Sequence, residues 1–254
     1  MSDKKQKIAI VTGATGGIGF QVAKRLCSDG YKVVLNGIED EEGAKRVEEL
    51  TQEGLQAEYL GFDVTDEEAV TSNIKAIGEK YGRIDVLVNN AGGLGGRSRF
   101  EEMTTEFYRF VMALNLDSAF FASRAAIPYL KKGDNPSIIN YTSIAAWNAG
   151  GPGAGIYGTS KAGVQALTRA LAKDLAEYGI RVNAVSPGTI DTPFHAQIKS
   201  TKPEVFASWK NNILLGKLGQ PEEVASVVSF LASDDASFIT AETIQITGGQ
   251  GLGI

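Results

Sequence analysis

Short strand-like segments alternate with longer helix-like segments along nearly the whole of this 254-residue chain. The strand-like segments are apolar and rich in β-branched residues, as expected for strands that are buried on both faces of a sheet. The predicted strands are Lys7–Thr12, Lys32–Asn36, Ala57–Gly61, Ile84–Asn89, Ser137–Thr142, Arg181–Ser186 and Thr243–Thr247. Strands that alternate with helices form a parallel sheet covered on both faces. The pattern therefore predicts a Rossmann-type, doubly wound α/β fold of about seven strands, in one domain spanning residues 1–254.

The segments between the strands carry the start and stop signals of helices. Asp66 precedes a helical pattern that runs to Tyr81, Pro221 is typical of a first helical turn, and Gly179 follows a long helix. The other helices that we predict are Phe20–Asp29, Glu41–Glu53, Thr105–Asn115, Asp117–Lys132 and Tyr157–Tyr178.

A glycine-rich turn, Gly13-Ala-Thr-Gly-Gly-Ile-Gly19, joins the first predicted strand to the first predicted helix. Glycine lets the backbone approach a pyrophosphate closely, and a helix N-terminus offers free N–H groups and a positive dipole. The spacing is Gly-x-x-x-Gly-x-Gly rather than the commoner Gly-x-Gly-x-x-Gly, and a tight strand-to-helix connection is the alternative. The strand–turn–helix context favours a dinucleotide site.

Tyr157 and Lys161 stand four residues apart, so a helix places them on one face. An ammonium beside a phenol favours the phenolate, and it would lower the tyrosine pKa from about 10 towards neutrality. A phenol tuned in this way can give or take a proton at working pH. Ser143, at the end of a predicted strand, is placed to hold a substrate oxygen beside it.

The polar and glycine-rich motifs follow the predicted strands directly. They are Gly13, Asp63, Asn89, Ser143 and the pair Pro187-Gly188. Ligands of open parallel sheets bind beyond the carboxyl ends of the strands. We therefore expect these positions to form one site at one edge of the sheet.

Charge and composition exclude several classes of function. The formal net charge is −5 without a basic cluster, which argues against nucleic acid as a partner. Cys27 is the sole cysteine, so no internal disulfide forms, and we expect it to be a small buried residue in a reducing compartment. We identify neither a signal peptide at the start nor an apolar run long enough to span a membrane. We expect a cytoplasmic protein with no membrane contact, and we assign no metal site.

Several motifs occur together and in order: Thr12-Gly13-x-x-x-Gly17-x-Gly19, Asn89-Asn90-Ala91-Gly92, Asn115, Ser143, Tyr157-x-x-x-Lys161 and Pro187-Gly188. From Lys7 to Gly249 the chain resembles the short-chain dehydrogenase/reductase family. The resemblance implies an NAD(P)-dependent oxidoreductase that interconverts alcohols and carbonyl compounds.

The resemblance also implies residue roles. Tyr157 would be the general acid/base, Ser143 would orient the substrate oxygen, and Lys161 would lower the tyrosine pKa and hold the nicotinamide ribose. Asn115 would support a proton-relaying water. The cofactor would be bound by Gly13, Thr15, Gly16, Gly17, Ile18, Gly19, Gly37, Ile38, Asp63, Val64, Asn89, Ala91, Gly92, Tyr157, Lys161, Pro187, Gly188, Ile190 and Thr192. Two departures from the family pattern are a slightly longer stretch between Ser143 and Tyr157, and Thr142 in place of serine.

The end of the second predicted strand bears on the choice between NADH and NADPH. An acidic residue there binds ribose hydroxyls, whereas an arginine accommodates a phosphate. Gly37 stands where the acid would fall and Ile38 where the arginine would, and Gly16 replaces a basic residue found in many NADP-preferring relatives. With no cation in reach and with Glu39 and Asp40 nearby, we expect NADH to be preferred, with dual use possible.

A second glycine-rich loop carries Arg97 and Arg99 beside the predicted pocket. Arginine is suited to bidentate capture of a carboxylate, although an ordinary salt bridge is the alternative for each. His195 would contact substrate or be a solvated residue of a lid around residues 190–215. Trp147 would stack on a sugar or pack internally.

Four further segments occur together: Ala91-Gly-Gly-Leu-Gly-Gly-Arg97-Ser98, Thr142-Ser-Ile-Ala-Ala146, Gly153-Ala-Gly-Ile-Tyr157 and Pro187-Gly-Thr-Ile-Asp-Thr-Pro-Phe-His195. In this combination the chain resembles, within the family, bacterial alginate-pathway reductases of 4-deoxy-L-erythro-5-hexoseulose uronate. That resemblance implies reduction of this acidic sugar to 2-keto-3-deoxy-D-gluconate. Alternatives are a sugar or polyol dehydrogenase, a 3-ketoacyl-thioester reductase and a non-catalytic dinucleotide sensor. The family resemblance further implies a homotetramer built through the Asp117 and Tyr157 helices and the C-terminal strand, with the tail Gly248–Ile254 at an interface.

Overall fold

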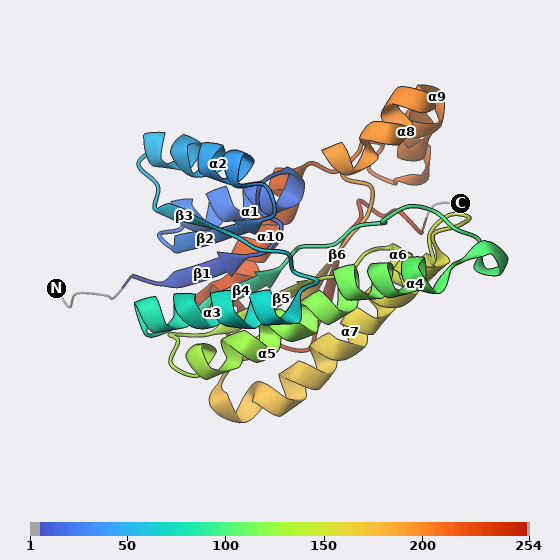
Figure 1. The fold of residues 1–254 in the computed structure, drawn as a ribbon. Coiled ribbons are helices and arrows are strands. Elements are labelled where there is room, and N and C mark those ends of the chain that lie inside the picture. The colour runs from blue at the N-terminus through green and yellow to red at the C-terminus, as the bar shows by residue number, and fades with distance from the viewer. Residues whose placement is uncertain (1–5, 253–254) are drawn as a thin grey trace.

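A seven-stranded parallel sheet forms the centre of the molecule in the computed structural model, which describes residues 6–252 (Figure 1). The strand order is β3-β2-β1-β4-β5-β6-β7. The strands are β1 (Ile8–Val11), β2 (Lys32–Gly37), β3 (Ala57–Gly61), β4 (Val86–Asn89), β5 (Ser137–Tyr141), β6 (Arg181–Pro187) and β7 (Thr243–Ile246). The predicted doubly wound α/β fold is confirmed.

Helices cover both faces of the sheet. They are α1 (Gly17–Ser28), α2 (Asp40–Gln52), α3 (Glu67–Tyr81), α4 (Thr105–Met112), α5 (Ser118–Leu130), α6 (Ala145–Asn148), α7 (Gly155–Leu175), α8 (Ala196–Thr201), α9 (Pro203–Ser208) and α10 (Pro221–Ala232). Side chains of α1 and α10 pack with one set of strand residues, and those of α3, α5 and α7 pack with the other. The two apolar cores that result hold the sheet rigid between them.

The chain changes direction across the sheet between β1 and β4. From β1 it runs outward through β2 to β3, then returns to place β4 on the other side of β1. A crevice forms at the carboxyl ends of two neighbouring strands when the connections that follow them lead to opposite sides of the sheet. The glycine-rich turn after β1 and the Asn90–Gly92 segment after β4 lie at this point, as the sequence predicts.

Several helix ends match their sequence signals. The Asp66 carboxylate accepts hydrogen bonds from the N–H groups of Glu68 and Ala69, which caps α3. Pro221 opens α10, and Gly179 ends the last turn after α7 with a left-handed φ of 69°. The first helix begins at Gly17 rather than Phe20, so the glycine-rich turn itself forms its first turn.

The prediction of two helices separated near Leu116 is wrong. One continuous helical run extends from Thr105 to Leu130, and its middle, Ala113–Asp117, is a π-helical turn. The run is long and apolar enough to cross a membrane by length and composition alone, which corrects the expectation that no such segment exists. Core helices of soluble proteins pass the same test, and here α5 packs against α3 and the sheet.

Short helical segments after β6 were not predicted. Pro193–His195, α8, α9 and Trp209–Asn212 follow one another in the segment predicted to be a lid. Figure 1 shows α8 and α9 projecting from the body of the fold. Three further single turns are Phe100–Glu102, Ala176–Tyr178 and Asp234–Ala236.

We predict that Gly78→Ala destabilises the protein, although alanine normally favours a helix interior by about 1 kcal/mol over glycine. A Cβ at Gly78 would lie 2.3 Å from Cγ of the Tyr129 ring, where α3 meets α5. Overpacking of this kind costs about 1–3 kcal/mol. Urea denaturation should show the loss, and Thr71→Ala on the exposed side of α3 is the control. Equal or higher stability of Gly78→Ala would contradict the close packing.

Candidate active site

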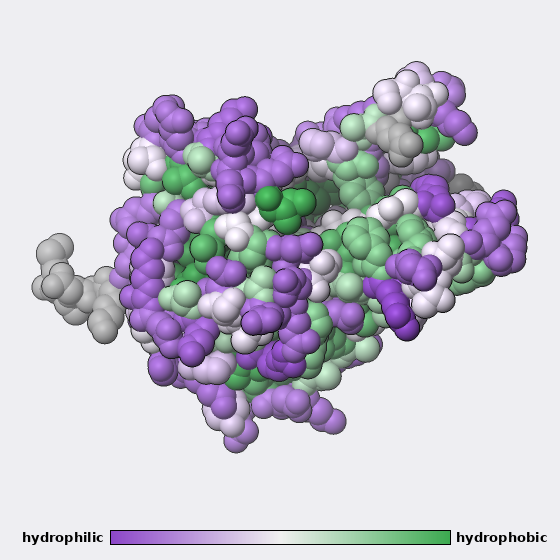
Figure 2. Space-filling view, viewed as in Figure 1, coloured by the Kyte–Doolittle hydropathy of each residue, from purple (hydrophilic) through white to green (hydrophobic). Residues whose placement is uncertain are grey.

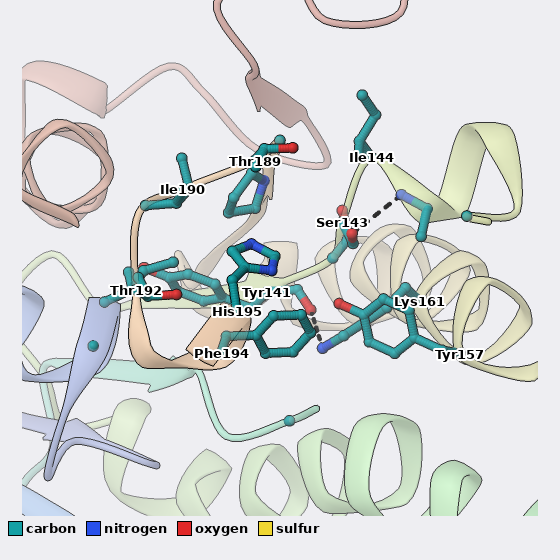
Figure 3. Close-up of a pocket in the computed structure, with 18 of the residues that line it drawn as sticks. Tyr141, Ser143, Ile144, Tyr157, Lys161, Thr189, Ile190, Thr192, Phe194 and His195 are labelled. Carbon is teal, nitrogen blue, oxygen red and sulfur yellow. Dashed lines mark hydrogen bonds between the residues drawn. The ribbon is translucent and has the colours of Figure 1, made fainter. Parts of the chain in front are cut away.

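One pocket of about 620 Å³ opens at the carboxyl ends of the strands. Its lining includes two cationic side chains, Arg97 and Lys161, and no carboxylate among the described residues. Figure 3 shows Ser143, Tyr157 and Lys161 on one side of the pocket and Ile190, Thr192 and His195 on the other. The predicted residues that line it are Gly13, Gly16, Gly17, Ile18, Gly19, Gly92, Arg97, Ser143, Tyr157, Lys161, Pro187, Gly188, Ile190, Thr192 and His195.

A set of hydrogen bonds fastens the end of β4 to the end of β1. The Thr12 hydroxyl accepts from the N–H groups of Asn90 at 3.1 Å and Ala91 at 3.0 Å. In return, the Asn90 amide donates to the carbonyls of Thr12 and Gly13, both at 2.9 Å. Asn90 had no role predicted from the sequence, and its side chain is one of those that hold the glycine-rich turn in place.

Two glycines of the glycine-rich turn, Gly13 and Gly19, stand where a side chain would collide with neighbouring atoms. A Cβ at Gly19 would lie 2.2 Å from the Gly13 carbonyl oxygen and 2.4 Å from Nδ2 of Asn90. Gly13 and Gly17 have left-handed φ angles of 61° and 53°, which glycine adopts without strain.

The N-terminus of α1 faces the pocket without a side-chain cap. The N-cap residue is Gly16, which has no side chain to accept hydrogen bonds from the first N–H groups of the helix. Gly17, Ile18 and Gly19 line the pocket. Uncapped N–H groups at the positive end of a 12-residue helix are suited to an anion such as a pyrophosphate. The turn and the helix end together fit a dinucleotide.

Three of the four predicted catalytic side chains come from the end of β5 and from α7. Ser143 follows β5, and its hydroxyl accepts a hydrogen bond from the N–H of Ala145 at 3.1 Å. Tyr157 and Lys161 lie on one face of α7, with the ammonium 5.9 Å from the centre of the tyrosine ring. The Lys161 ammonium is buried and donates to the Tyr141 carbonyl at 2.9 Å. The spacing therefore brings these groups together as expected.

The charges of the site differ from expectation. Burial raises the pKa of Tyr157, and a hydrogen bond with the Ser143 side chain opposes this rise. Burial also lowers the pKa of Lys161 from 10.5 to about 8. The expectation that Lys161 makes the phenol more acidic is not met, because desolvation weakens the cation and disfavours the phenolate.

Asn115 occupies the π-helical turn and lies next to Lys161. Its amide donates to the carbonyls of Gly93 and Val111, and its side-chain oxygen accepts from the N–H of Gly93. A Cβ at Gly92 would lie 2.8 Å from both the Asn115 oxygen and the Lys161 nitrogen. The extra residue of a π turn often marks a functional position, and here it directs Asn115 towards the glycine loop that follows β4.

On the side of β2 and β3, the predicted residues lie outside the pocket wall. A Cβ at Gly37 would lie 2.5 Å from Cγ2 of Thr15, so no side chain fits at this strand end, and Ile38 is 74% exposed. The Asp63 carboxylate accepts from the N–H and hydroxyl of Thr65. Val64 is buried in the core on the α3 side of the sheet.

A cation that the sequence did not reveal, Arg46, lies behind the glycine-rich turn. Arg46 on α2 donates from Nε to the Thr15 carbonyl at 3.0 Å. Its guanidinium also forms ion pairs with Glu42 at 2.8 Å and Glu49 at 2.9 Å. The charge of Arg46 is thus neutralised by two carboxylates, and its hydrogen bond to the Thr15 carbonyl supports the glycine-rich turn.

Asn89 was predicted to line the pocket, but it is not among the lining residues. It is 5% exposed, and its amide donates to Ser123 at 3.0 Å and Asn140 at 2.8 Å. These bonds join β4 to β5 and α5 inside the protein. Ala91, also predicted at the cofactor, is bound to Thr12 through its backbone N–H.

The substrate side contains some of the expected groups. Arg97 is exposed at the pocket and donates to the Pro152 carbonyl at 2.9 Å, while Arg99 is exposed away from the lining. Trp147 is 60% exposed and is not among the residues that line the pocket. The prediction of Trp147 as a substrate contact is therefore not supported by its position.

His195 lies within a group of aromatic rings at the pocket. Its ring centre is 5.2 Å from that of Trp209, 5.0 Å from Phe194 and 5.7 Å from Phe206. Burial is the main reason that its pKa is lowered, with the Lys199 ammonium adding to the effect. Trp209, which sequence analysis missed, lines the pocket where Trp147 was expected to act.

The C-terminal segment reaches the pocket through Gln250, which was also missed. Its side-chain oxygen accepts from the Thr189 N–H at 2.8 Å, and its amide donates to the Thr189 hydroxyl at 2.9 Å. These bonds hold the loop that carries Pro187, Gly188 and Ile190. A glutamine just after a glycine pair gives no local signal of such a long-range contact.

The comparisons with known proteins agree with this geometry. A family model described as "Enoyl-(Acyl carrier protein) reductase" matches residues 13–250. The chain is 38% identical to 3-oxoacyl-(acyl-carrier-protein) reductase FabG of Thermotoga maritima, over 96% of this chain and 97% of that protein. It is 36% identical to 7alpha-hydroxysteroid dehydrogenase of Bacteroides fragilis, over 98% of this chain and 96% of that protein.

Solved structures match over the same length. The ligand-free aldohexose dehydrogenase of Thermoplasma acidophilum has a TM-score of 0.87 and 36% identity, and the match covers 100% of this chain and 97% of that chain. A short-chain type dehydrogenase/reductase from Mycobacterium ulcerans has a TM-score of 0.91 and 30% identity, covering 98% and 91%.

We predict that the buried ammonium of Lys161 makes stability depend on pH. Its folded pKa of about 8 lies below the unfolded value of 10.5, so the unfolded chain binds more protons between these values. The free energy of unfolding of the wild type should therefore rise with pH across this window, relative to Lys161→Met, by about 3 kcal/mol. Urea titrations from pH 7 to 10.5 would measure this, with exposed Lys173→Met as control. A constant difference between wild type and Lys161→Met would contradict the low pKa.

Proposed function

Since the chain belongs to the short-chain dehydrogenase/reductase family and acts on CH–OH and C=O groups, we propose that it reduces an acidic sugar aldehyde with NADH. The proposed substrate is 4-deoxy-L-erythro-5-hexoseulose uronate, and the product 2-keto-3-deoxy-D-gluconate. The observation that carries this proposal is the pocket lining, in which Arg97 accompanies Ser143, Tyr157 and Lys161 without any carboxylate among the described residues. A guanidinium in such surroundings attracts and pairs with a substrate carboxylate.

The residues that would hold the cofactor are those that form the turn after β1 and the loops after β4 and β6. N–H groups of Gly17, Ile18 and Gly19 would bind the pyrophosphate, and Lys161 would bind the nicotinamide ribose. Thr192, which is buried at the pocket, would bind the carboxamide. When bound, the reduced dinucleotide supplies the hydride that the carbonyl carbon receives.

The side chains of the chain itself would manage the proton. Tyr157 would donate its phenolic proton to the carbonyl oxygen as charge develops there, because burial keeps the phenol protonated until that moment. The Ser143 hydroxyl would hold the same oxygen, and the Lys161 charge would stabilise the phenolate that remains. Asn115, held by the π-helical turn beside Lys161, would support a water that returns a proton to the site.

The surroundings of β2 and β3 support a preference for NADH. Asp40 lies at these strand ends, since a Cβ at Gly61 would come within 2.3 Å of its carboxylate. A carboxylate there binds ribose hydroxyls and repels a phosphate. Arg46, the cation nearby, is already paired with Glu42 and Glu49.

A second candidate is reduction of a 3-ketoacyl thioester. The 38% identity with the FabG reductase over nearly the whole chain favours it. The aromatic groups Phe194 and Trp209 at the pocket would accept an acyl chain. The net charge of −5 is unfavourable for an acidic carrier protein, so we place this function second.

We also propose a homotetramer, a cytoplasmic location and closure of residues 190–215 over the substrate. Apolar side chains exposed along the Thr105–Leu130 run, such as Phe110 and Phe120, support the assembly. Figure 2 shows apolar residues gathered on this side of the molecule. Of the predicted tail interface, Gly253 and Ile254 lie outside the described residues.

We predict that Tyr157→Phe lowers turnover at least a hundredfold, the lower end of the usual contribution of general acid–base catalysis. The ring remains, so NADH should bind with nearly unchanged affinity. Stopped-flow turnover and NADH fluorescence titration would measure the two quantities. Near-normal turnover would remove Tyr157 from its proposed role.

We predict that Arg97→Ala raises the Michaelis constant for the uronate at least tenfold and leaves that for an uncharged aldose aldehyde within about twofold, since only the uronate carries a charge to pair. Initial rates with NADH and NADPH on uronates, aldoses and acetoacetyl thioesters would test this and the second candidate together. Arg99→Ala, on the same loop but outside the pocket, is the matched control. Equal effects of Arg97→Ala on charged and uncharged substrates would argue against carboxylate capture.

A further inference from the structure

The loop that follows β6 leaves the sheet at the pocket. Where it leaves, the Gly188 N–H donates to the carbonyl of Ile246, the last residue of β7, at 3.0 Å. Beyond Ile246 the chain turns away through Gly248 and Gly249, whose φ angles of 60° and 83° are left-handed. The part-buried N–H of Thr189 therefore needs a partner from outside the strand, because a backbone donor removed from water without one is unfavourable.

The side chain of Gln250 supplies that partner. Its oxygen accepts from the Thr189 N–H at 2.8 Å, and its amide donates to the Thr189 hydroxyl at 2.9 Å. The contact is close, since a Cβ at Gly188 would lie 2.6 Å from the same oxygen. Gln250 thus continues, with a side chain, the pairing that the backbone of β7 ends at Ile246.

Gln250 extends from a tail that is itself held. The Gly248 carbonyl accepts from the N–H of Leu215 at 3.1 Å, and a Cβ at Gly249 would lie 2.7 Å from Cδ1 of Leu214. The Gln250 N–H donates to the Thr247 carbonyl at 3.0 Å, which closes the turn. A side chain on a fixed turn loses little freedom when it forms its bonds, so this arrangement is suited to hold a loop.

The loop that Gln250 holds leads directly to the proposed cofactor site. The Thr189 carbonyl accepts from the N–H of Gly219 at 3.1 Å. Three residues later, Thr192 lies beside the glycine-rich turn, since a Cβ at Gly17 would be 3.9 Å from its Cβ. Figure 3 shows Thr189 and Thr192 on this loop at the pocket. The position of Thr192 therefore depends on how Thr189 is fixed.

We propose that Gln250 is a positioning residue for the nicotinamide end of the cofactor, because by fixing Thr189 it holds Thr192 where the carboxamide binds. This inference rests on the proposed function, which assigns Thr192 to the carboxamide. Gln250 acts through the loop and not on the reacting atoms. Without its two hydrogen bonds, only a fraction of the molecules would present Thr192 correctly, and the apparent affinity falls by that fraction.

Gln250→Met keeps the length of the side chain and removes both hydrogen bonds. We expect its dissociation constant for NADH to rise about tenfold, which corresponds to a correctly placed loop in about one molecule of ten. ADP-ribose lacks the nicotinamide, so its dissociation constant should stay within about twofold of the wild-type value. Fluorescence titration with NADH and calorimetric titration with ADP-ribose measure the two constants without any substrate.

Gln245→Met is the matched control, because it makes the same substitution at an exposed position of β7. It should leave both dissociation constants unchanged. An equal loss of affinity for NADH and ADP-ribose in Gln250→Met would overturn the proposal, because the effect would not be confined to the nicotinamide end. A lower melting temperature with unchanged affinity for both ligands would also overturn it, since Gln250 would then have a structural role only.

A double-mutant cycle with Thr189→Val tests whether Gln250 acts through the loop. Thr189→Val removes the hydroxyl and leaves the N–H bonded to Gln250, so it should raise the NADH dissociation constant about threefold. In the Gln250→Met background it should add nothing, because its partner is already gone. Additive effects would overturn this inference and leave the proposed function intact.

Two further outcomes complete the test. Thr189→Val is the milder change and should also leave ADP-ribose binding unaltered, so it supplies the comparison of ligands if Gln250→Met does not fold. Equal losses for both ligands in Thr189→Val would contradict the proposal in the same way. Failure of the wild-type protein to bind NADH or NADPH would overturn the proposed function together with this inference.

Discussion

The junction between β1 and β4 is the constraint on which the site depends. The connections that follow these two parallel strands lead to opposite sides of the sheet, and the Thr12 hydroxyl and the Asn90 amide tie the strand ends together. Without these bonds the glycine-rich turn would have no fixed distance from the Gly92 loop. Because Asn115 and Lys161 pack against Gly92, the same junction also positions the catalytic side. The same junction therefore positions both the glycine-rich turn and the side chains proposed to transfer the proton.

Burial of the proposed catalytic groups disfavours the charged forms of both Tyr157 and Lys161. The Lys161 ammonium is buried and donates to the Tyr141 carbonyl, and none of the described residues in the pocket wall is a carboxylate. Burial therefore weakens its hold on a proton. Tyr157 is kept neutral by the same lack of solvent. Functional sites often retain such locally unfavourable groups, and the stability comes from elsewhere in the fold. Here two apolar cores on either side of a rigid sheet supply it.

Much of the fold could be predicted because strand burial and helix capping are local signals. The apolar runs located all seven strands, and Asp66, Gly179 and Pro221 marked helix ends. The π turn at Asn115 was missed, since the hydrogen bonds that accompany it join Asn115 to Gly93, 22 residues away in the sequence. The short helices after β6 pack mainly on one another. Their sequences therefore lack the regular spacing of apolar residues that predicts a helix packed on a sheet.

The site was predicted as a set of positions more successfully than as a set of orientations. Asn89 and Asn90 are neighbours in a strand end, and alternation sends one into the interior and the other towards the glycine-rich turn. Sequence alone does not tell which one turns inward. Trp147 was predicted at the pocket and Trp209 was missed for a similar reason, because only folding decides which indole lines the pocket. Arg46 required knowledge of how α2 lies against Thr15.

The double hydrogen bond between Gln250 and Thr189 has a practical consequence for handling the protein. It places the pocket wall two residues from Leu252, whereas β1 begins at the opposite, amino-terminal edge of the sheet (Figure 1). An affinity tag or fusion partner attached at the carboxyl end would therefore emerge beside the ligand entrance and compete with it for space. Attachment ahead of β1 keeps such additions a full strand length away from the chemistry.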